Sequence, residues 1–299
     1  MRKDRPTYLA EEVKDLDDPA FDTFMEKVTG GDRKSRPEDS YVHIDELEEA
    51  VDKVRKERGQ FKGFSTGYKV LDDKMGGLEK GSVVLIGGKT SNGKSALATN
   101  IAAKVCDKDG PNVPLLYISL EMTQEQMLDR LDHITDPKRL NMMFQKSYAI
   151  SYKDLEPLIL KAKMEREIEV VVLDYLQYLG RGMNLDEVAR MSKTIKALAL
   201  KYDVCMVVIV SLRKGDTKTV WTDIGVDELM GTAAIGYDAD TIVLASRKDT
   251  NDEFRPDQIY VRVLKTRNLK LDYNDRDVPL DWNDTKITES KFDTIGRGI

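Results

Sequence analysis

Short apolar runs alternate with amphipathic stretches along most of the chain. The runs lie at residues 83–86, 115–119, 170–173, 206–210, 241–245 and 259–264. They lack the apolar–polar alternation of a strand with one solvated face, so they are typical of strands buried on both faces in a parallel sheet. Between two of them, one apolar stripe at helical spacing comprises Val188, Met191, Ile195 and Leu198. This order predicts an α/β fold with a mainly parallel central sheet flanked by helices.

The first sixty residues follow a different pattern. Residues 29–40 have the polar composition of a linker, and residues 1–42 are predicted to be a flexible arm. A helix is predicted at residues 43–60, where one face carries Ile44, Leu47, Val51 and Val54. That face can pack on the chain's own domain or dock on a neighbouring subunit, and we expect the neighbouring subunit. Residues 61–299 then form the α/β domain.

Composition narrows the class of protein. The chain has 299 residues, of which 40% are hydrophobic and 33% charged, and its formal net charge is −6. These values predict a soluble protein with a substantial core and without a global basic field. The start lacks the apolar segment of a signal peptide, and the longest apolar run, 204–210, is too short to cross a bilayer. The expected compartment is therefore the cytoplasm.

The strongest local signal is a glycine-rich loop after the first predicted strand. Residues 88–95, GKTSNGKS, match the pattern G-x-x-x-x-G-K-[ST], and a helical stretch follows. The glycines let backbone N–H groups close around a β-phosphate, Lys94 reaches the β- and γ-phosphates, and the Ser95 hydroxyl binds Mg²⁺. We therefore expect ATP with Mg²⁺. Its predicted binding residues in this loop are Gly88, Ser91, Asn92, Gly93, Lys94, Ser95 and Ala96.

Two carboxylates are candidates for the chemistry around those phosphates. Asp174 ends the apolar run at 170–173 and is the expected second ligand of Mg²⁺. In many ATPases a glutamate base follows that aspartate directly, but the next residue here is Tyr175, which cannot act as the base. Glu121, just after the run at 115–119, can orient the attacking water instead. Its alternative role is to stabilise the start of the next helix through the helix dipole.

Taken in order, several short motifs resemble the DnaB family of replicative DNA helicases over residues 43–286. They are GYKVLD at 67–72, SLEM at 119–122, LDYLQ at 173–177, DAD at 238–240 and KTRN at 265–268. The resemblance implies a RecA-like core, with Glu121 as the catalytic base and Arg130 packed against adenine. It also implies that Lys265 and Arg267 reach into the ATP site of the next subunit.

The last of these motifs also has a physical interpretation. Lys265 and Arg267 alternate at the end of a predicted strand, so both should point the same way, outward from the sheet. An arginine there can neutralise the charge that develops on a neighbour's phosphate. Exposed cations at a strand end are the plainer alternative.

The function that the resemblance implies is that of an ATP-dependent DNA helicase. It implies a homo-oligomer, a six-membered ring around single-stranded DNA, which translocates 5′ to 3′ and unwinds duplex in replication. A helicase loader or primase would be a further partner. If the gene is phage-encoded, the compartment is the cytoplasm of the bacterial host.

The sequence departs from the family pattern in three ways. Leu212 stands where the family has a glutamine or histidine that senses the γ-phosphate, and Met230 replaces a DNA-contacting arginine. From the short stretch that precedes the motor, we do not expect the family's N-terminal helical domain, which meets primase. The residues left for DNA contact are Arg213, Lys214, Lys218, Gly231 and Thr232. For residues 213–221, a solvated surface loop is an equally good interpretation.

Two other functions remain open. A RadA- or RecA-like recombination ATPase shares the core, although the LDYLQ motif and the helix that precedes the motor favour the DnaB type. A nucleotide-dependent assembly or loading partner without unwinding activity would explain the missing glutamine and arginine. The sequence as a whole favours the helicase.

Overall fold

The computed structural model describes most of the predicted α/β domain. The described residues are 63–145, 150–180, 182–212, 224–226, 233–247, 254–267, 277–283 and 285–290, together with Ile44, Leu229 and Leu269. The predicted arm at 1–42 lies outside them, and so does the predicted helix at 43–60, apart from the exposed and helical Ile44.

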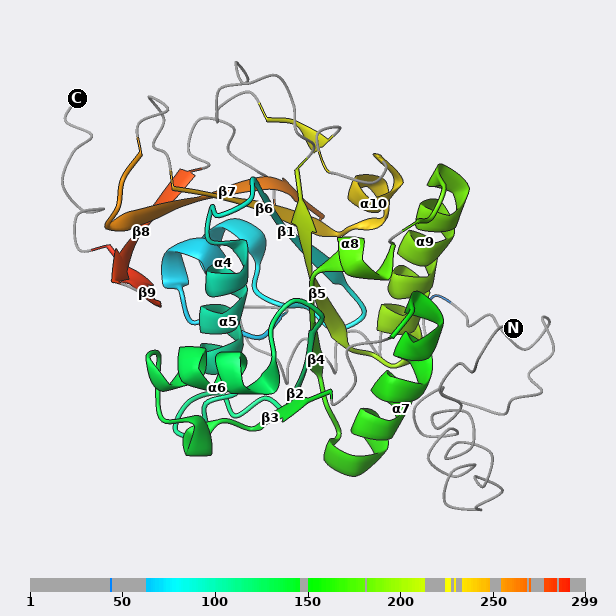
Figure 1. The fold of residues 1–299 in the computed structure, drawn as a ribbon, viewed down its shortest axis with the longest axis horizontal. Helices are drawn as coiled ribbons and strands as arrows, with labels where there is room; N and C mark the ends of the chain where they lie inside the picture. Colours follow the sequence, from blue (N-terminus) through cyan, green and yellow to red (C-terminus); the bar gives the residue numbers. More distant parts are fainter. Residues whose placement is uncertain are drawn as a thin grey trace, which may run out of the picture.

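A nine-stranded sheet runs through the described part of the chain in the order β3-β2-β4-β5-β1-β6-β7-β8-β9 (Figure 1). Its strands are β1 (Val83–Gly88), β2 (Leu115–Ser119), β3 (Met142–Phe144), β4 (Val170–Asp174), β5 (Cys205–Ser211), β6 (Thr241–Ser246), β7 (Gln258–Thr266), β8 (Asp277–Asn283) and β9 (Lys286–Glu289). Neighbours from β3 to β6 are parallel, whereas β6 to β9 pair antiparallel. All six predicted strands are present, and the predicted α/β class with a mainly parallel sheet is confirmed.

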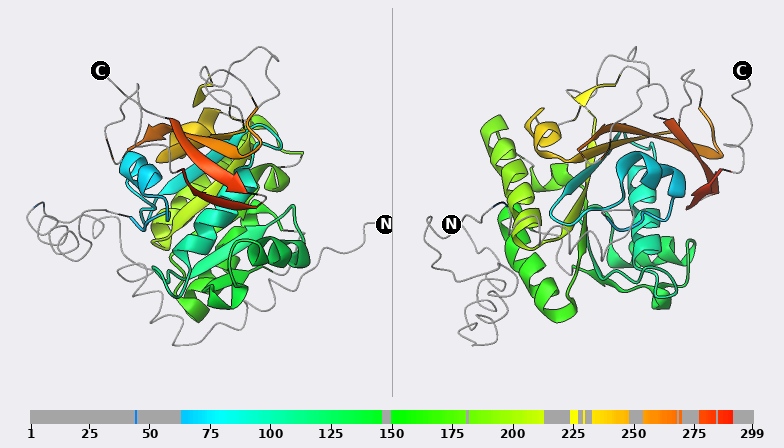
Figure 2. Two further views of the ribbon diagram at one scale, coloured as in Figure 1. Left: turned by 90° about the vertical axis from the view of Figure 1, so that its left-hand side faces the viewer. Right: turned by 180° about the vertical axis from the view of Figure 1, so that it is seen from behind.

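Helices cover both faces of this sheet (Figures 1 and 2). They are α4 (Lys69–Met75), α5 (Lys94–Val105), α6 (Gln124–Asp132), α7 (Leu155–Arg166), α8 (Leu176–Leu179), α9 (Leu185–Lys201) and α10 (Ala233–Asp238). Residues of α4, α5 and α6 belong to one buried cluster, and residues of α7 to α10 belong to another. Within the described ranges, no helix combines the length and the apolar character that a bilayer crossing needs.

The two clusters explain why the parallel strands carry apolar residues on both faces. In β1, Val83 and Leu85 pack in the cluster of α7 to α10, whereas Val84 and Ile86 pack in the other. Successive side chains of a strand point to opposite faces, so a strand covered on both sides needs apolar residues throughout. Each such side chain contributes about 1.5–3 kcal/mol when it is fully buried.

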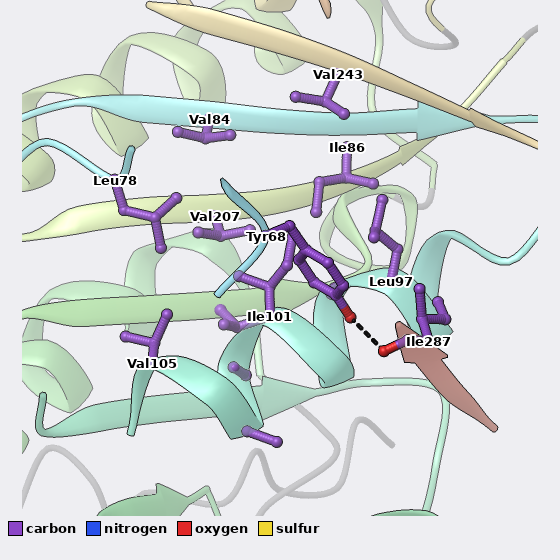
Figure 3. Packing of buried hydrophobic residues seen from close by; sticks show 14 of the residues in the cluster. Tyr68, Leu78, Val84, Ile86, Leu97, Ile101, Val105, Val207, Val243 and Ile287 are labelled. Carbon is purple, nitrogen blue, oxygen red and sulfur yellow. Dashed lines mark hydrogen bonds between the residues drawn. The ribbon is translucent and has the colours of Figure 1, made fainter. Parts of the chain in front are cut away.

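The C-terminal hairpin is fastened to the helix that follows the glycine-rich loop. Tyr68 is fully buried beside α5, and its hydroxyl donates to the carbonyl of Ile287 in β9 at 3.0 Å (Figure 3). The Asn100 amide donates to the carbonyl of Thr285 at 2.7 Å and accepts from the N–H of Ile287 at 2.9 Å. The hairpin of β8 and β9 therefore lies along α5, next to the predicted phosphate loop.

Candidate nucleotide-binding site

The predicted phosphate loop connects β1 to α5. Gly93 caps α5 with a φ of 86°, and Ser91 has a φ of 64°, so the loop turns through left-handed backbone conformations. A Cβ on Gly93 would collide with the ring of Trp282, which lies against the loop. Glycine at 93 is therefore required twice, by its conformation and by the close approach of the ring. The resulting turn points the free N–H groups at the start of α5 into the loop.

Lys94 is buried, and its ammonium lies over the loop. The amine donates to the carbonyl of Lys89 at 2.9 Å. Burial lowers the pKa of Lys94, while the carboxylates of Asp174 and Glu121 act in the opposite direction. The two candidate acids are therefore close enough to affect the same ammonium.

Ser95 and Asp174, 79 residues apart in sequence, are in contact. The Ser95 hydroxyl donates to one carboxylate oxygen of Asp174 at 3.0 Å, and the Tyr117 hydroxyl donates to the other at 3.3 Å. Burial raises the pKa of the Asp174 carboxyl to about 6, and the Ser95 hydrogen bond opposes that rise. A hydroxyl and a carboxylate side by side are oxygen donors that suit a hard divalent cation such as Mg²⁺.

Glu121 lies at the same edge of the sheet. Ser119 pairs with Asp174 in the register of β2 and β4, so the residues after Ser119 emerge beside Asp174. The Glu121 side chain is exposed, and its charge adds to the effect of burial in raising the pKa of Asp174. The structure therefore brings Lys94, Ser95, Asp174 and Glu121 together at the carboxyl ends of β1, β2 and β4.

Arg130 lies near this group on α6. Burial raises the pKa of Asp174 and of Tyr117, and the positive charge of Arg130 opposes that rise at both groups. One guanidinium nitrogen, Nη1, is buried and has no hydrogen-bond partner among the described residues. The structure thus places the Arg130 side chain near the carboxylate that is the predicted cation ligand.

Two further residues of the site were not predicted from the sequence. Trp282 of β8 packs on Gly93, and the Arg247 guanidinium lies 4.4 Å from the centroid of the Trp282 ring. Phe254 packs on the same guanidinium at 5.1 Å. The alternation of Val278, Leu280 and Trp282 would have predicted a late strand, but not its place beside the loop.

Lys265 and Arg267 lie at the opposite end of the strands from the loop, level with the start of β1. Thr266 pairs with Thr241, which pairs with Val84 near the start of β1. The loop begins after Gly88, so the rise of a strand separates the two levels by about 15 Å. Arg267 is therefore remote from the phosphate loop of its own chain.

Both cations contact their own chain at this end. The Lys265 amine donates to the carbonyls of Gly236, Tyr237 and Ala239 at 3.0, 3.0 and 2.6 Å. Arg267 donates to Asp240 at 3.0 Å and to the carbonyl of Tyr237 at 3.2 Å. Both side chains point the same way, as predicted, but toward the end of α10 instead of outward.

The predicted DNA contacts at Arg213, Lys214, Lys218, Gly231 and Thr232 lie outside the described residues, as does Met230. Leu212, at the position of the family's polar sensor, is buried, and its N–H donates to the carbonyl of Gly88 at 3.2 Å. The residue at which the family resemblance predicts a polar sensor is therefore apolar, and its backbone contacts the end of β1, where the phosphate loop begins.

Comparison with known proteins gives consistent results. The family model described as the DnaB-like helicase C terminal domain matches residues 63–136 and 131–285. The replicative DNA helicase DnaB of Leifsonia xyli is 25% identical over 245 residues, which are 72% of this chain and 52% of that protein. DnaB of Geobacillus stearothermophilus is 27% identical over 256 residues, covering 73% of this chain and 55% of that protein. The chain thus spans about half the length of these two relatives.

Solved structures share the fold. A solved ATPase domain superposes with a TM-score of 0.69 at 19% identity, covering 84% of this chain and all of that one. A DnaB-like replicative helicase, solved in a study of its interactions with primase, gives a TM-score of 0.69 at 18% identity, covering 95% of this chain and 75% of that one. The RecA-like architecture of the core is therefore shown.

Proposed function

The chain belongs to the family of DnaB-like helicase C-terminal domains, and from that membership we propose that it is an ATP-hydrolysing motor that translocates on single-stranded DNA and unwinds duplex in replication. The observation that carries the proposal is the contact of Ser95 with Asp174 beneath a phosphate loop, with Glu121 at the same sheet edge. A fold alone would not imply ATP hydrolysis, but this group of side chains supports it.

The nucleotide would be ATP with Mg²⁺. The loop from Gly88 to Ser95 would hold the phosphates, with Lys94 on the β- and γ-phosphates. Ser95 and Asp174 would hold the cation, which neutralises charge on the phosphate oxygens when it is bound. Glu121 would accept the proton of the attacking water, because it is an exposed carboxylate that follows β2 beside Asp174.

The adenine base of the nucleotide would lie against the Trp282 ring. An aromatic ring and a guanidinium offer flat surfaces on which a purine can stack. Trp282 and Arg247 lie beside the phosphate loop, whereas Arg130 lies on the Asp174 side. We therefore propose that the adenine base stacks on Trp282 and Arg247, while the packing of Arg130 against adenine, which the family resemblance implies, stays a prediction.

The active site would be completed by a second subunit. Arg267 is remote from the loop of its own chain, and its side chain is about half exposed. It can therefore serve a neighbour's phosphates only in an oligomer, for which we propose a hexameric ring with DNA through its centre. The helix at 43–60 would dock on the neighbouring subunit, and a loader or primase would bind the assembled ring.

One observation favours a second function. Buried Leu212 cannot sense the γ-phosphate through a polar side chain, which is a departure expected of an assembly or loading partner that does not unwind DNA. The two functions differ in strand displacement.

A forked duplex tests this choice directly. The helicase should displace a labelled strand in the presence of ATP and Mg²⁺, and its ATPase rate should rise with single-stranded DNA. Forks with only a 5′ or only a 3′ tail give the direction, for which we expect 5′ to 3′. Nucleotide-dependent assembly without any strand displacement would favour the loading partner.

A further inference from the structure

Gln145 follows the last residue of β3 and lies beside the turn that carries Glu121. The ladder between β2 and β3 ends at the pair of Tyr117 and Phe144, and the N–H of Gln145 still donates to the carbonyl of Tyr117 at 3.3 Å. Beyond that point the side-chain amide of Gln145, instead of a further backbone peptide, bonds to β2. Its Oε1 accepts from the N–H of Ser119 at 2.9 Å, and its Nε2 donates to the carbonyl of Ser119 at 2.8 Å.

This double contact occupies both backbone groups of Ser119, as the next peptide of a strand would. Gln145 is 6% exposed, so water cannot readily replace either hydrogen bond. The edge strand β3 is only three residues long, and the amide extends its reach toward the end of β2. Gln145 thus fixes the backbone two residues before Glu121.

The other side of the turn is held by the strand that carries the cation ligand. The N–H of Leu120 donates to the carbonyl of Asp174 at 2.7 Å. Within the turn, the Ser119 hydroxyl bonds the N–H and the carbonyl of Met122, each at 3.1 Å. The backbone around Glu121 is therefore clamped between Asp174 on one side and Gln145 on the other.

The exposed Glu121 side chain depends on this clamp for its position. A base must lie within hydrogen-bond reach of the water that it activates, and a displacement of about 1 Å can cost up to about a hundredfold in rate. A backbone fixed at Ser119 and Leu120 limits where the Glu121 carboxylate can be.

We propose that Gln145 is a positioning residue for Glu121, acting through the backbone of Ser119. The inference rests on the proposed role of Glu121 as the base of ATP hydrolysis. Gln145 bonds Ser119 and not the phosphate loop, so its loss should slow the chemical step and leave nucleotide affinity unchanged.

The experiment combines two substitutions in the full chain. Gln145→Met keeps the length of the side chain and removes both hydrogen bonds to Ser119. Steady-state kcat and KM for ATP, single-turnover hydrolysis and Mg-ATP binding are measured for Gln145→Met, Glu121→Gln and the double variant. Asn141→Ala is the matched control, because it removes an amide hydrogen bond, to Asn112 at 3.3 Å, from the residue just before β3.

We expect Gln145→Met to lower kcat about tenfold or more, with KM for ATP within about twofold of the wild type. In the Glu121→Gln background the same substitution should change the rate by less than about twofold, because the group that it positions is already gone. Asn141→Ala should hydrolyse ATP like the wild type. If Gln145→Met does not fold, Gln145→Asn is used, because it keeps an amide but is too short to bond both groups of Ser119.

The outcomes separate the two hypotheses. Normal hydrolysis by Glu121→Gln would overturn the base assignment itself, whatever Gln145 does. A slow Glu121→Gln with a normal kcat for both Gln145 variants would overturn the positioning role. So would an equal loss in both backgrounds, a rise in KM alone, or failure of both Gln145 variants to fold, since each of these marks Gln145 as a structural residue.

Discussion

Arg267 and Asp240 are joined by two hydrogen bonds at the end of the sheet that lies opposite the phosphate loop. The Arg267 guanidinium donates to the Asp240 carboxylate at 3.0 Å, and the backbone N–H of Arg267 donates to the Asp240 carbonyl, also at 3.0 Å. The Asp240 carboxylate also accepts from Lys196 at 2.7 Å and from the N–H of Val83 at 2.8 Å. Arg267 is thereby fixed beside the start of β1, whereas the phosphates would bind beyond the carboxyl end of that strand.

This placement predicts complementation between two inactive variants. Arg267→Ala should bind ATP nearly normally and hydrolyse it on the order of a thousandfold more slowly, because its charge acts mainly in the transition state. Mixed with Lys94→Ala, it should recover part of the activity, since only a mixed oligomer joins an intact loop to an intact arginine. Steady-state ATPase of the mixture measures this.

Arg190→Ala, on the exposed side of α9, is the control for removal of an arginine and should retain activity. Subunit exchange is verified separately with tagged chains. Exchange without any recovered activity would place Arg267 in its own subunit's chemistry, contrary to the geometry.

Lys94→Ala should abolish ATP hydrolysis and weaken nucleotide binding, because the β- and γ-phosphates lose their cationic partner. The matched control is Lys89→Ala, which removes an exposed side chain of the same loop and keeps the carbonyl that Lys94 contacts. Turnover of Lys94→Ala close to that of Lys89→Ala would refute the phosphate-loop assignment.

Glu121→Gln should bind Mg-ATP and hydrolyse it at least about a hundredfold more slowly, the range expected for a lost base. Glu125→Gln, four residues on in the first turn of α6, tests the alternative that an acid here merely stabilises the helix start. Similar rates for the two variants would assign Glu121 to the helix and not to the reaction.

Trp282→Ala should weaken ATP binding about tenfold, since stacking of a base on an aromatic ring contributes about 1–3 kcal/mol. Trp282→Phe keeps a ring and should bind within about threefold of the wild type. Equilibrium titration with a fluorescent ATP analogue measures both. A comparable loss for pyrophosphate would show instead that the ring supports the loop at Gly93 and does not bind the base.

The sequence predicted the parts of the fold that local pattern determines. The parallel strands are apolar on both faces, so their runs are visible without a structure. Thr123 and Gln126 likewise have the spacing of a capping box in the sequence, and α6 forms it with both hydrogen bonds. By contrast, β3 was missed because three residues cannot establish a period. The strand β8 was missed because Pro279 lies within it, and a proline argues against a strand even where Val278, Leu280 and Trp282 alternate with polar positions.

Some contacts of the candidate site could likewise be predicted from sequence motifs, and others could not. The contact of Ser95 with Asp174 follows from two strand-end motifs whose strands lie in one parallel sheet. The roles of Trp282 and Gln145 depend on which strands become neighbours, which no local motif records. The contacts of Lys265 with α10 were not predicted either, because the antiparallel pairing of β6 and β7 creates them.

In the proposed arrangement, the separation of Arg267 from its own phosphate loop gives each subunit two unlike ends, one with a phosphate loop that lacks an arginine and one that offers the arginine. Association through these ends is heterologous and has a direction, so a two-fold symmetric dimer built on one shared patch does not join them. If Arg267 serves a neighbour's loop as proposed, an open row of subunits would leave one loop and one arginine unused, and only a closed ring would give every subunit a complete site. The ATPase rate per chain should therefore rise as subunits assemble and reach its maximum when the ring closes. The specific activity of a preparation would then report the fraction of closed rings.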